Sequence, residues 1–247
     1  MPLPTAPSRK IALVTGAARR IGRSIALALA DDGWDVGLHY RSSAHEAETL
    51  AAAIRRCGVR AAAIGADLSD PAAVAGLVPG CAAALGAPSL LVNNASEFRL
   101  DTLETMTSET WDLHLAVNLR APVFLARALA AGLPAGTPGN IINIIDQRVW
   151  KLTPEFYSYT ISKAGLWTAT RTLAQALAPH IRVNAIGPGP VLQSVHQAPA
   201  EFEAECRSTL LKRGADTREI ADAVRFILGA PAMTGQMIAL DGGQHLS

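Results

Sequence analysis

The stretch "KIALVTGAARRIG", Lys10 to Gly22, sets a pattern that the rest of the chain repeats. Its first half is a short apolar run, which is typical of a buried strand. A turn of small residues follows, and we expect an alanine-rich helix over about 21–32. Continuous apolar strands that alternate with helices are typical of a parallel sheet covered on both faces. The sequence therefore predicts an α/β fold.

The remaining elements continue this alternation without a linker, an internal repeat or a low-complexity break. The sequence predicts one Rossmann-type, doubly wound domain over residues 1–247, with about seven parallel strands and helices on both faces. Residues 1–8 are expected to form a loose tail. The least regular segment, 188–212, follows a strand at the edge where ligands bind, and is a candidate substrate loop. We expect further strands over about 35–40, 59–68, 89–96, 140–146, 181–189 and 236–243, and helices over about 44–57, 71–85, 108–131, 157–178 and 217–228.

Composition excludes several classes of protein. The formal net charge is +1, which gives no electrostatic footprint for nucleic acid or for an acidic membrane surface. Cys57, Cys81 and Cys206 are widely spaced and lie in no Cys/His cluster, so neither a disulfide framework nor a metal site is indicated. The start, "MPLPTAPSRK", has no apolar core of a signal peptide, and no later segment has 18 consecutive apolar residues. We expect a cytoplasmic protein with no membrane segment.

The turn "TGAARRIG", Thr15 to Gly22, joins the first strand to the first helix. Small residues there let the backbone approach a pyrophosphate, and a helix N-terminus favours its negative charge. As a spacing alone the motif is weak, but its position after the first strand favours a dinucleotide site with Gly16, Ile21 and Gly22 at the phosphates.

The end of the second strand distinguishes NAD from NADP. An acidic residue there would bind the ribose 2′-hydroxyl of NAD. This chain has no acid before Glu46, and its arginines offer forked donors for a 2′-phosphate. The alternative is that these arginines are solvated surface charges, but two of them in the loops that flank the ribose favour NADPH. The predicted residues are Arg19, His39, Tyr40, Arg41 and Ser42.

A tyrosine and a lysine stand one helical turn apart in "YTISK", at Tyr159 and Lys163. Reduction by a hydride needs a proton donor at the partner atom. We expect the charge of Lys163 to lower the pKa of Tyr159, and its ammonium to hold the nicotinamide ribose.

Asp146 lies at the end of the preceding strand, where a neutral hydroxyl donor would suit a carbonyl substrate. An ionised carboxylate would repel an alkoxide by ~4 kcal/mol at a separation of about 4 Å. The sign reverses for a C=N bond in a ring that carries amino and N–H donors, because the carboxylate accepts those hydrogen bonds. Asp146 therefore favours an imine-like heterocycle over a simple ketone.

The motifs "TGAARRIG", "NNAS", "YTISK" and "NAIGPGP" are spaced like those of the short-chain dehydrogenase/reductase family, and the resemblance covers essentially the whole chain. It implies that Asn118 helps to hold the lysine through water, and that the protein is a homotetramer. One of Asn93 and Asn94 could instead cap the backbone at the strand end. The implied cofactor contacts are Asp67 and Leu68 at the adenine, Asn93 and Ala95 at the ribose, and Pro188 and Gly189 at the nicotinamide.

Within that family, "TGAARRIGRSIA", "LHYRSSAHEAETL" and "NNASEF" look like the segments of the pteridine reductases. The resemblance implies that Ser96 contacts a pterin and that Phe98 stacks on it, while Asp146 and Tyr159 match the catalytic pair. Phe98 could instead be an aromatic packed on the core.

The sequence thus predicts an NADPH-dependent reductase that converts dihydropterins, or dihydrofolate-like substrates, to the tetrahydro form. Asp146, Tyr159 and Lys163 would deliver the proton. One alternative is a broad carbonyl or cyclic-imine reductase of the same family. A second is a dinucleotide- or pterin-sensing protein without turnover, against which the intact set of three residues weighs.

Overall fold

The computed structural model describes residues 9–194 and 197–247. The tail expected at residues 1–8 lies outside this part of the chain. Seven strands form one parallel sheet in the order β3-β2-β1-β4-β5-β6-β7. This confirms the predicted doubly wound fold. The strands are β1 (Ile11–Val14), β2 (Asp35–Tyr40), β3 (Ala61–Gly65), β4 (Leu90–Asn93), β5 (Gly139–Ile144), β6 (Ile181–Pro188) and β7 (Met237–Leu240).

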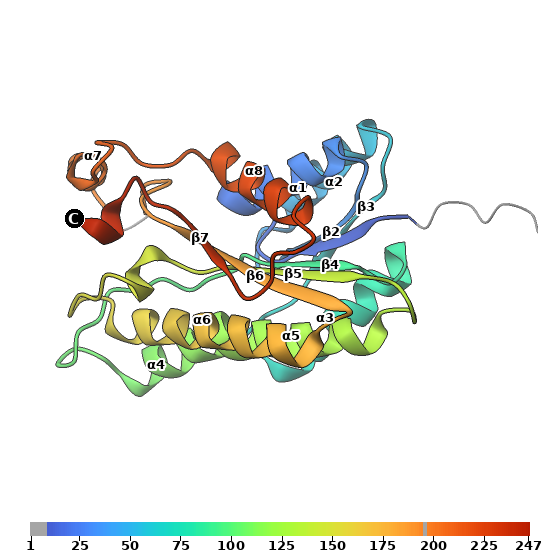
Figure 1. The fold of residues 1–247 in the computed structure, drawn as a ribbon, viewed down its shortest axis with the longest axis horizontal. Coiled ribbons are helices and arrows are strands. Elements are labelled where there is room, and N and C mark those ends of the chain that lie inside the picture. The colour runs from blue at the N-terminus through green and yellow to red at the C-terminus, as the bar shows by residue number, and fades with distance from the viewer. Residues whose placement is uncertain (1–8, 195–196) are drawn as a thin grey trace, which may run out of the picture.

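Helices cover both faces of the sheet (Figure 1). On one face lie α1 (Arg20–Asp31), α2 (Ala44–Arg56) and α8 (Thr217–Leu228), and their side chains form an apolar core with β1, β2 and β4. On the other face lie α3 (Pro71–Leu85), α4 (Ser108–Leu115), α5 (Ala121–Gly132) and α6 (Tyr157–Leu177). The inner strands β1, β2, β4, β5 and β6 are buried from both sides, which is why their sequences read as mainly apolar runs rather than alternating ones.

The order of the strands reverses between β1 and β4, which pair in register from Ala12 with Leu90 to Val14 with Val92. The connections after β1 and β4 therefore leave in opposite directions and open a crevice at the carboxyl ends of the strands. The loops that carry most of the predicted cofactor and catalytic residues meet at this edge.

Two elements differ from the sequence-based expectation. The single helix expected over 108–131 is divided by a π-helical turn, η1 (Ala116–Arg120), between α4 and α5. The irregular segment expected over 188–212 contains a helix, α7 (Pro199–Ser208). Pro199 stands at its first turn, where the missing N–H costs nothing, and Glu201 accepts a hydrogen bond from the N–H of Ala198 at 2.9 Å.

The helical run Ser108–Gly132 is, by length and composition, apolar enough to cross a membrane. In the fold, however, Leu125 and Leu129 pack into the core beneath the sheet, and His114 and Asn118 are buried with polar partners. We interpret the run as a core helix with an apolar outer side, on which Phe124 is exposed.

Candidate active site

A cavity of about 890 Å³ opens at the carboxyl edge of the sheet. Segments that follow β1 to β6 form its walls, together with α7 and the C-terminal turn η3 (Gln244–Leu246). The fold thus brings together residues that are far apart in the sequence. The predicted site residues that line the cavity are Gly16, Arg19, Ile21, Gly22, His39, Tyr40, Arg41, Ser42, Asp67, Leu68, Ala95, Ser96, Phe98, Asp146, Tyr159, Lys163, Pro188 and Gly189.

Asn93 lies apart from this wall. Its side chain is 3% exposed and donates to Asn143 Oδ1 at 2.8 Å, in the interior of the sheet. Its neighbour Asn94 lines the cavity, and its amide donates to the carbonyl oxygens of Thr15 at 2.9 Å and Gly16 at 3.1 Å. Successive side chains of a strand point to opposite faces, so Asn94 is the one that caps the backbone of the turn.

Asn118 is a support of the cavity wall rather than part of its surface. It sits in η1, fully buried, where Oδ1 accepts from the N–H of Glu97 at 2.9 Å and from Ser96 Oγ at 3.1 Å. Its Nδ2 donates to the carbonyl of Glu97 and to Ser162 Oγ. Asn118 therefore fixes the segment that carries Ser96 and Phe98 against α6.

The turn after β1 is shaped for a close approach of backbone to ligand. Gly16 has a φ of 62°, which favours glycine. A Cβ on Gly22 would lie 2.2 Å from the carbonyl oxygen of Gly16, so only glycine permits α1 to begin this close to the strand. The turn and the helix N-terminus together fit a pyrophosphate.

His39 is a buried brace for this turn and not a surface cation. Its Nδ1 accepts the N–H of Gly16 at 3.1 Å, which leaves the Nε2–H to donate to the carbonyl of Ala66 at 3.0 Å. Burial lowers the pKa of His39, so the ring is neutral. The residue joins the ends of β1, β2 and β3.

The two arginines expected at a 2′-phosphate are exposed and each forms an ion pair. Arg19 pairs with Glu46 on α2, and Arg41 pairs with Glu97, which follows β4. Exposed pairs of this kind contribute little to stability. An incoming phosphate can therefore replace the glutamates as the partner of these arginines at little cost in stability.

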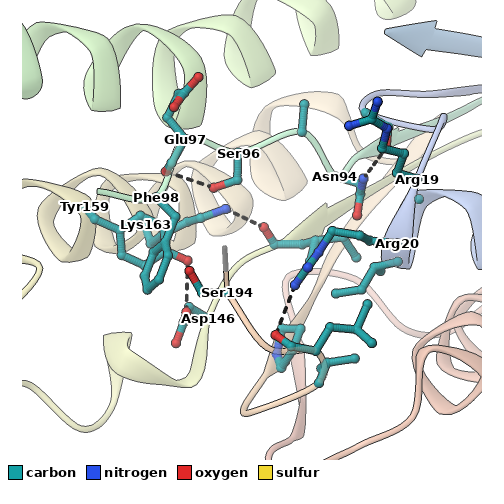
Figure 2. A pocket seen from close by; sticks show the side chains of 18 of the residues that line it. Arg19, Arg20, Asn94, Ser96, Glu97, Phe98, Asp146, Tyr159, Lys163 and Ser194 are labelled. Atoms are coloured by element: carbon teal, nitrogen blue, oxygen red, sulfur yellow. Dashed lines mark hydrogen bonds between the residues drawn. The ribbon is translucent and has the colours of Figure 1, made fainter. Parts of the chain in front are cut away.

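Asp146, Tyr159 and Lys163 converge at the far end of the cavity (Figure 2). Tyr159 Oη donates to Asp146 Oδ2 at 2.9 Å. Lys163 Nζ donates to the carbonyl of Ile144 at 2.9 Å, and the tyrosine ring lies beneath it at 5.7 Å. Tyr159 and Lys163 are 5% and 2% exposed, so a bound ring would meet them in a nearly dry environment.

This burial shifts the pKa of each of the three groups. It raises the pKa of Tyr159 well above its ordinary value, and the adjacent Asp146 raises it further. It also raises the pKa of Asp146, and lowers the pKa of Lys163 to about 8. The expectation that Lys163 lowers the pKa of Tyr159 is wrong for this structure, because desolvation and the carboxylate act in the opposite direction.

Phe98 belongs to a stack of rings at the cavity. It lies parallel to Phe156 at 4.4 Å between ring centroids, and edge to face with Tyr159 at 4.7 Å. Phe156 adopts a φ of 55° just before α6, and the guanidinium of Arg148 lies 4.7 Å from the centroid of its ring. Phe98 is thus an aromatic of the cavity wall, and its stacking on a pterin stays a prediction.

A buried polar chain underlies this stack. The carboxylate of Asp101 accepts from Ser158 Oγ and, at 3.1 Å, from the N–H of Ser158. His114 Nδ1 lies 2.6 Å from the same hydroxyl, while its Nε2 accepts the N–H of Arg99 at 3.1 Å. Because Nε2 accepts, Nδ1 donates, and the burial that lowers the pKa of His114 keeps the ring neutral.

Arg20 is a cavity residue that the sequence reasoning missed. Figure 2 shows it reaching from the turn after β1 toward the segment after β6, where it donates to the carbonyls of Leu192 at 3.0 Å and Gln193 at 2.9 Å. Nothing in the local sequence distinguishes it from Arg19. Only the fold shows which of the two crosses the cavity.

Comparison with known proteins identifies the family. A family model described as enoyl-(acyl carrier protein) reductase matches residues 16–245. Among curated proteins, a short-chain type dehydrogenase/reductase of Picea abies is 34% identical over 95% of this chain and 92% of its own length. A 3-oxoacyl-[acyl-carrier-protein] reductase FabG of Staphylococcus aureus is 33% identical over 96% of this chain and 98% of its own.

Solved structures are more similar still. FolM alternative dihydrofolate reductase 1 of Brucella canis, in complex with NADP, is 48% identical with a TM-score of 0.94, over 96% of this chain and 94% of that one. A short-chain dehydrogenase of Burkholderia cenocepacia, also with NADP, is 35% identical with a TM-score of 0.90, over 95% and 97% of the two chains. Fold, motifs and relatives agree, and the chain belongs to the short-chain dehydrogenase/reductase family.

Proposed function

We propose that this oxidoreductase reduces dihydropterins, or dihydrofolate-like substrates, to the tetrahydro form with NADPH. The observation that carries the proposal is the 2.9 Å hydrogen bond from Tyr159 Oη to Asp146 Oδ2 at the buried end of the cavity. A carboxylate in that place suits a nitrogen heterocycle and opposes a developing alkoxide.

The cavity fits a dinucleotide along its whole length. Gly16 and Gly22 leave room for a pyrophosphate, Arg19 and Arg41 lie at the ribose end, and Lys163 lies at the other. Bound NADPH would supply the hydride. NADP in the solved structures of the Brucella canis and Burkholderia cenocepacia proteins supports this cofactor.

The protein's own groups would supply binding and the proton. The Asp146 carboxylate would accept N–H donors of the heterocycle and thereby orient its C=N bond. Tyr159 holds its proton firmly because its pKa is raised, so it releases that proton only to a nitrogen that becomes strongly basic as the hydride arrives on carbon. Lys163 would bind the ribose and stabilise negative charge left on Tyr159.

The descriptions of the relatives favour two different classes of substrate. The Brucella canis protein, described as an alternative dihydrofolate reductase, favours the pterin proposal. The FabG proteins reduce a 3-oxoacyl carbonyl by name, which favours the broad carbonyl or cyclic-imine reductase as second candidate. The position of Asp146 favours the first. The third hypothesis, a sensor without turnover, gives no reason for a buried proton donor.

The test compares substrates in one variant. Asp146→Ser should cut kcat/KM for a dihydropterin by about a hundredfold or more, while activity on cyclohexanone stays equal or rises. Tyr159→Phe should lower both activities. Ratios of kcat/KM across substrates cancel a general loss of folded protein. If Asp146→Ser reduces the pterin as fast as the unmodified enzyme, or loses both activities equally, the carbonyl reductase takes first place.

Phe98 offers an independent check on the pterin slot. Phe98→Ala should raise KM for a dihydropterin about fivefold, since ring stacking contributes on the order of 1 kcal/mol beyond buried area. The KM for NADPH should stay within about twofold, because Phe98 lies at the substrate end. A loss of thermal stability with unchanged kinetics would make Phe98 a core aromatic only.

The proposal also includes a homotetramer. The half-exposed apolar side of α5, with Phe124 45% exposed, is a surface that a neighbouring subunit would cover. Light scattering of the purified protein measures the mass directly. The cytoplasmic location stays a prediction from the sequence.

A further inference from the structure

The cations that line the cavity differ in whether an anion already neutralises them. Arg19 and Arg41 each pair with a glutamate, Arg20 donates to two backbone carbonyls, and Lys163 donates to one. Arg148 also lines the cavity and, like Arg20 and Lys163, has no carboxylate ion-pair partner among the described residues. It differs from those two cations because its guanidinium donates to a side-chain hydroxyl and not to a carbonyl oxygen.

Local contacts hold this guanidinium in place. Its Nη1 donates to Thr153 Oγ1 at 2.9 Å, and its Cζ lies 4.7 Å from the centroid of the Phe156 ring. These two contacts leave other N–H groups of the fork for a ligand. An arginine that is already oriented loses little side-chain freedom when it binds an anion.

Arg148 is also fixed relative to the proton donors. It stands two residues after Asp146, within the 3-10 turn η2 (Gln147–Val149), and its backbone N–H donates to Asp146 Oδ1 at 2.8 Å. The positive charge therefore lies just beyond the place where the heterocycle would bind, on the side of the Phe98–Phe156 stack.

The wall formed by α7 has the opposite charge. Glu201 and Glu205 both line the cavity. Glu205 accepts from Gln197 at 2.9 Å and from Gln244 at 3.3 Å, so its carboxylate is held at the wall. A negatively charged group on the substrate would be repelled by α7 and attracted to Arg148.

We propose that Arg148 is the subsite for an anionic tail on the heterocyclic substrate, a carboxylate or a phosphate. This inference rests on the proposed pterin reductase and makes it more specific: the preferred substrate carries a negative side chain that runs toward Arg148 and away from α7. An arginine fork binds either anion in the same way, with paired N–H donors to two oxygens.

Three substrates distinguish the source of the anion. Dihydrobiopterin has a neutral tail, dihydrofolate has glutamyl carboxylates, and dihydroneopterin monophosphate has a phosphate. In Arg148→Gln, the ratio of kcat/KM for an anionic substrate to that for dihydrobiopterin should fall about tenfold, mainly through KM. Arg148→Lys should restore part of the ratio because it keeps the charge. The anion whose ratio falls more is the one for which the subsite is built.

Arg99→Gln is the matched control. Arg99 is a neighbouring exposed arginine that pairs with Glu97 at 3.7 Å and does not line the cavity. Its ratios should stay within about twofold. If Arg148→Gln lowers all three activities equally, Arg148 acts only by lowering the pKa of Asp146, and the subsite is refuted. Unchanged ratios for both anionic substrates refute it as well.

Binding separates this proposal from the proposed function. Folate and biopterin are titrated calorimetrically into the NADP⁺-loaded protein and into its Arg148→Gln variant. A selective loss of folate affinity supports the subsite even if no pterin is turned over, in which case the reductase proposal alone fails. Equal affinities for folate in the two proteins overturn a carboxylate subsite, and together with an unchanged kcat/KM ratio for dihydroneopterin monophosphate they overturn the subsite altogether.

Discussion

Asp146 and Tyr159 form a pair in which burial opposes the charge of both partners. The spacing of the residues was enough to predict their meeting, because a strand end and the first turn of the next helix must approach each other in this fold. Their electrostatics were not readable from the sequence. How much water reaches a side chain depends on the ring stack of Phe98 and Phe156 and on the loops that cover it.

Lys163 leads to a prediction about pH. Its pKa in the folded protein is about 8, below the ordinary 10.5, so the ammonium is present below about pH 8 and lost above it. The kcat/KM for a dihydropterin should therefore decline above about pH 8, because this parameter reports the free enzyme. Lys163→Arg keeps its charge, so its profile should lack this alkaline limb, at a lower rate throughout. An unmodified enzyme with constant kcat/KM up to pH 10 would contradict the prediction.

The same group has a linked effect on stability. Between about pH 8 and 10.5 the unfolded chain retains a proton on Lys163 that the folded chain has lost. The contribution of this lysine to the free energy of unfolding therefore increases as pH rises through that window. The free energy of unfolding of the unmodified protein, minus that of Lys163→Arg, should increase across the window. A constant difference would show that the lysine does not change its charge there.

Arg41 determines a prediction about cofactor choice. Arg41→Asp should lower kcat/KM for NADPH by at least about tenfold and hardly change that for NADH, since charge-assisted contacts contribute ~1.5–3 kcal/mol. Glu97→Gln should act in the opposite direction and raise the NADPH/NADH ratio, because it removes the carboxylate that now pairs with Arg41. Arg23→Asp, an exposed change on α1 outside the cavity wall, is the control. Equal efficiencies with both cofactors in the unmodified enzyme would refute the assignment.

At the scale of elements, the chain from Asp101 through Ser158 to His114 joins a loop to α4 and α6. Ser158→Ala removes the hydroxyl to which both buried partners bond, and should cost about 1–3 kcal/mol of the free energy of unfolding. Because the same loop carries Phe98, KM for a dihydropterin should rise while KM for NADPH stays constant.

Thr160→Val is the matched control for this change. Thr160 is buried in the same helix, but its hydroxyl has no hydrogen-bond partner among the described residues. Removing this hydroxyl should lower the free energy of unfolding by less than Ser158→Ala does. The KM values for a dihydropterin and for NADPH should both stay constant. Urea unfolding and steady-state kinetics on the two variants decide the matter. Equal losses in both would mean that the polar chain has no special part in holding the loop.

Most elements were predictable because their signals are local. Pro71 and Asp70 mark the start of α3, Asp216 and Glu219 cap α8, and both helices begin where the sequence predicts. The π-helical turn η1 has no such signal. It accommodates one extra residue so that the buried Asn118 faces the loop after β4, and that need comes from tertiary contacts. The helix α7 was not predicted, because the prolines in and before it are typical of an irregular segment.

At the scale of the whole molecule, the cavity draws its wall from the ends of six strands. A ligand that binds there joins segments from residue 16 to residue 244 and stabilises only the folded state. NADPH at about a hundred times its dissociation constant should raise the free energy of unfolding by ~2.7 kcal/mol. NADH at the same concentration should raise the melting temperature less. A scan with equal shifts for the two cofactors would contradict the predicted selectivity without any assay of turnover.

The cavity joins residues that lie far apart in the sequence, and this separation limits what a sequence pattern can predict. Arg19 and Arg20 are adjacent, have the same chemistry and follow the same strand, yet Arg19 turns to α2 and Arg20 crosses to Leu192, 172 residues later. The role proposed for Arg148 likewise depends on its positions relative to Phe156 and α7, which the fold provides and the local sequence does not. Motifs predict which loops reach the edge of the sheet, whereas the direction of each long side chain depends on residues that no motif includes.

The two hydrogen bonds of Arg20 affect how quickly ligands can enter and leave the cavity. They fasten the segment after β6 to the turn after β1, over a cavity through which every reactant and product must pass. Both bonds are exposed to solvent, so they break and re-form rapidly, yet while they hold, the cavity is narrowed on that side. Exchange of ligands on that side of the cavity is therefore tied to the lifetime of this contact.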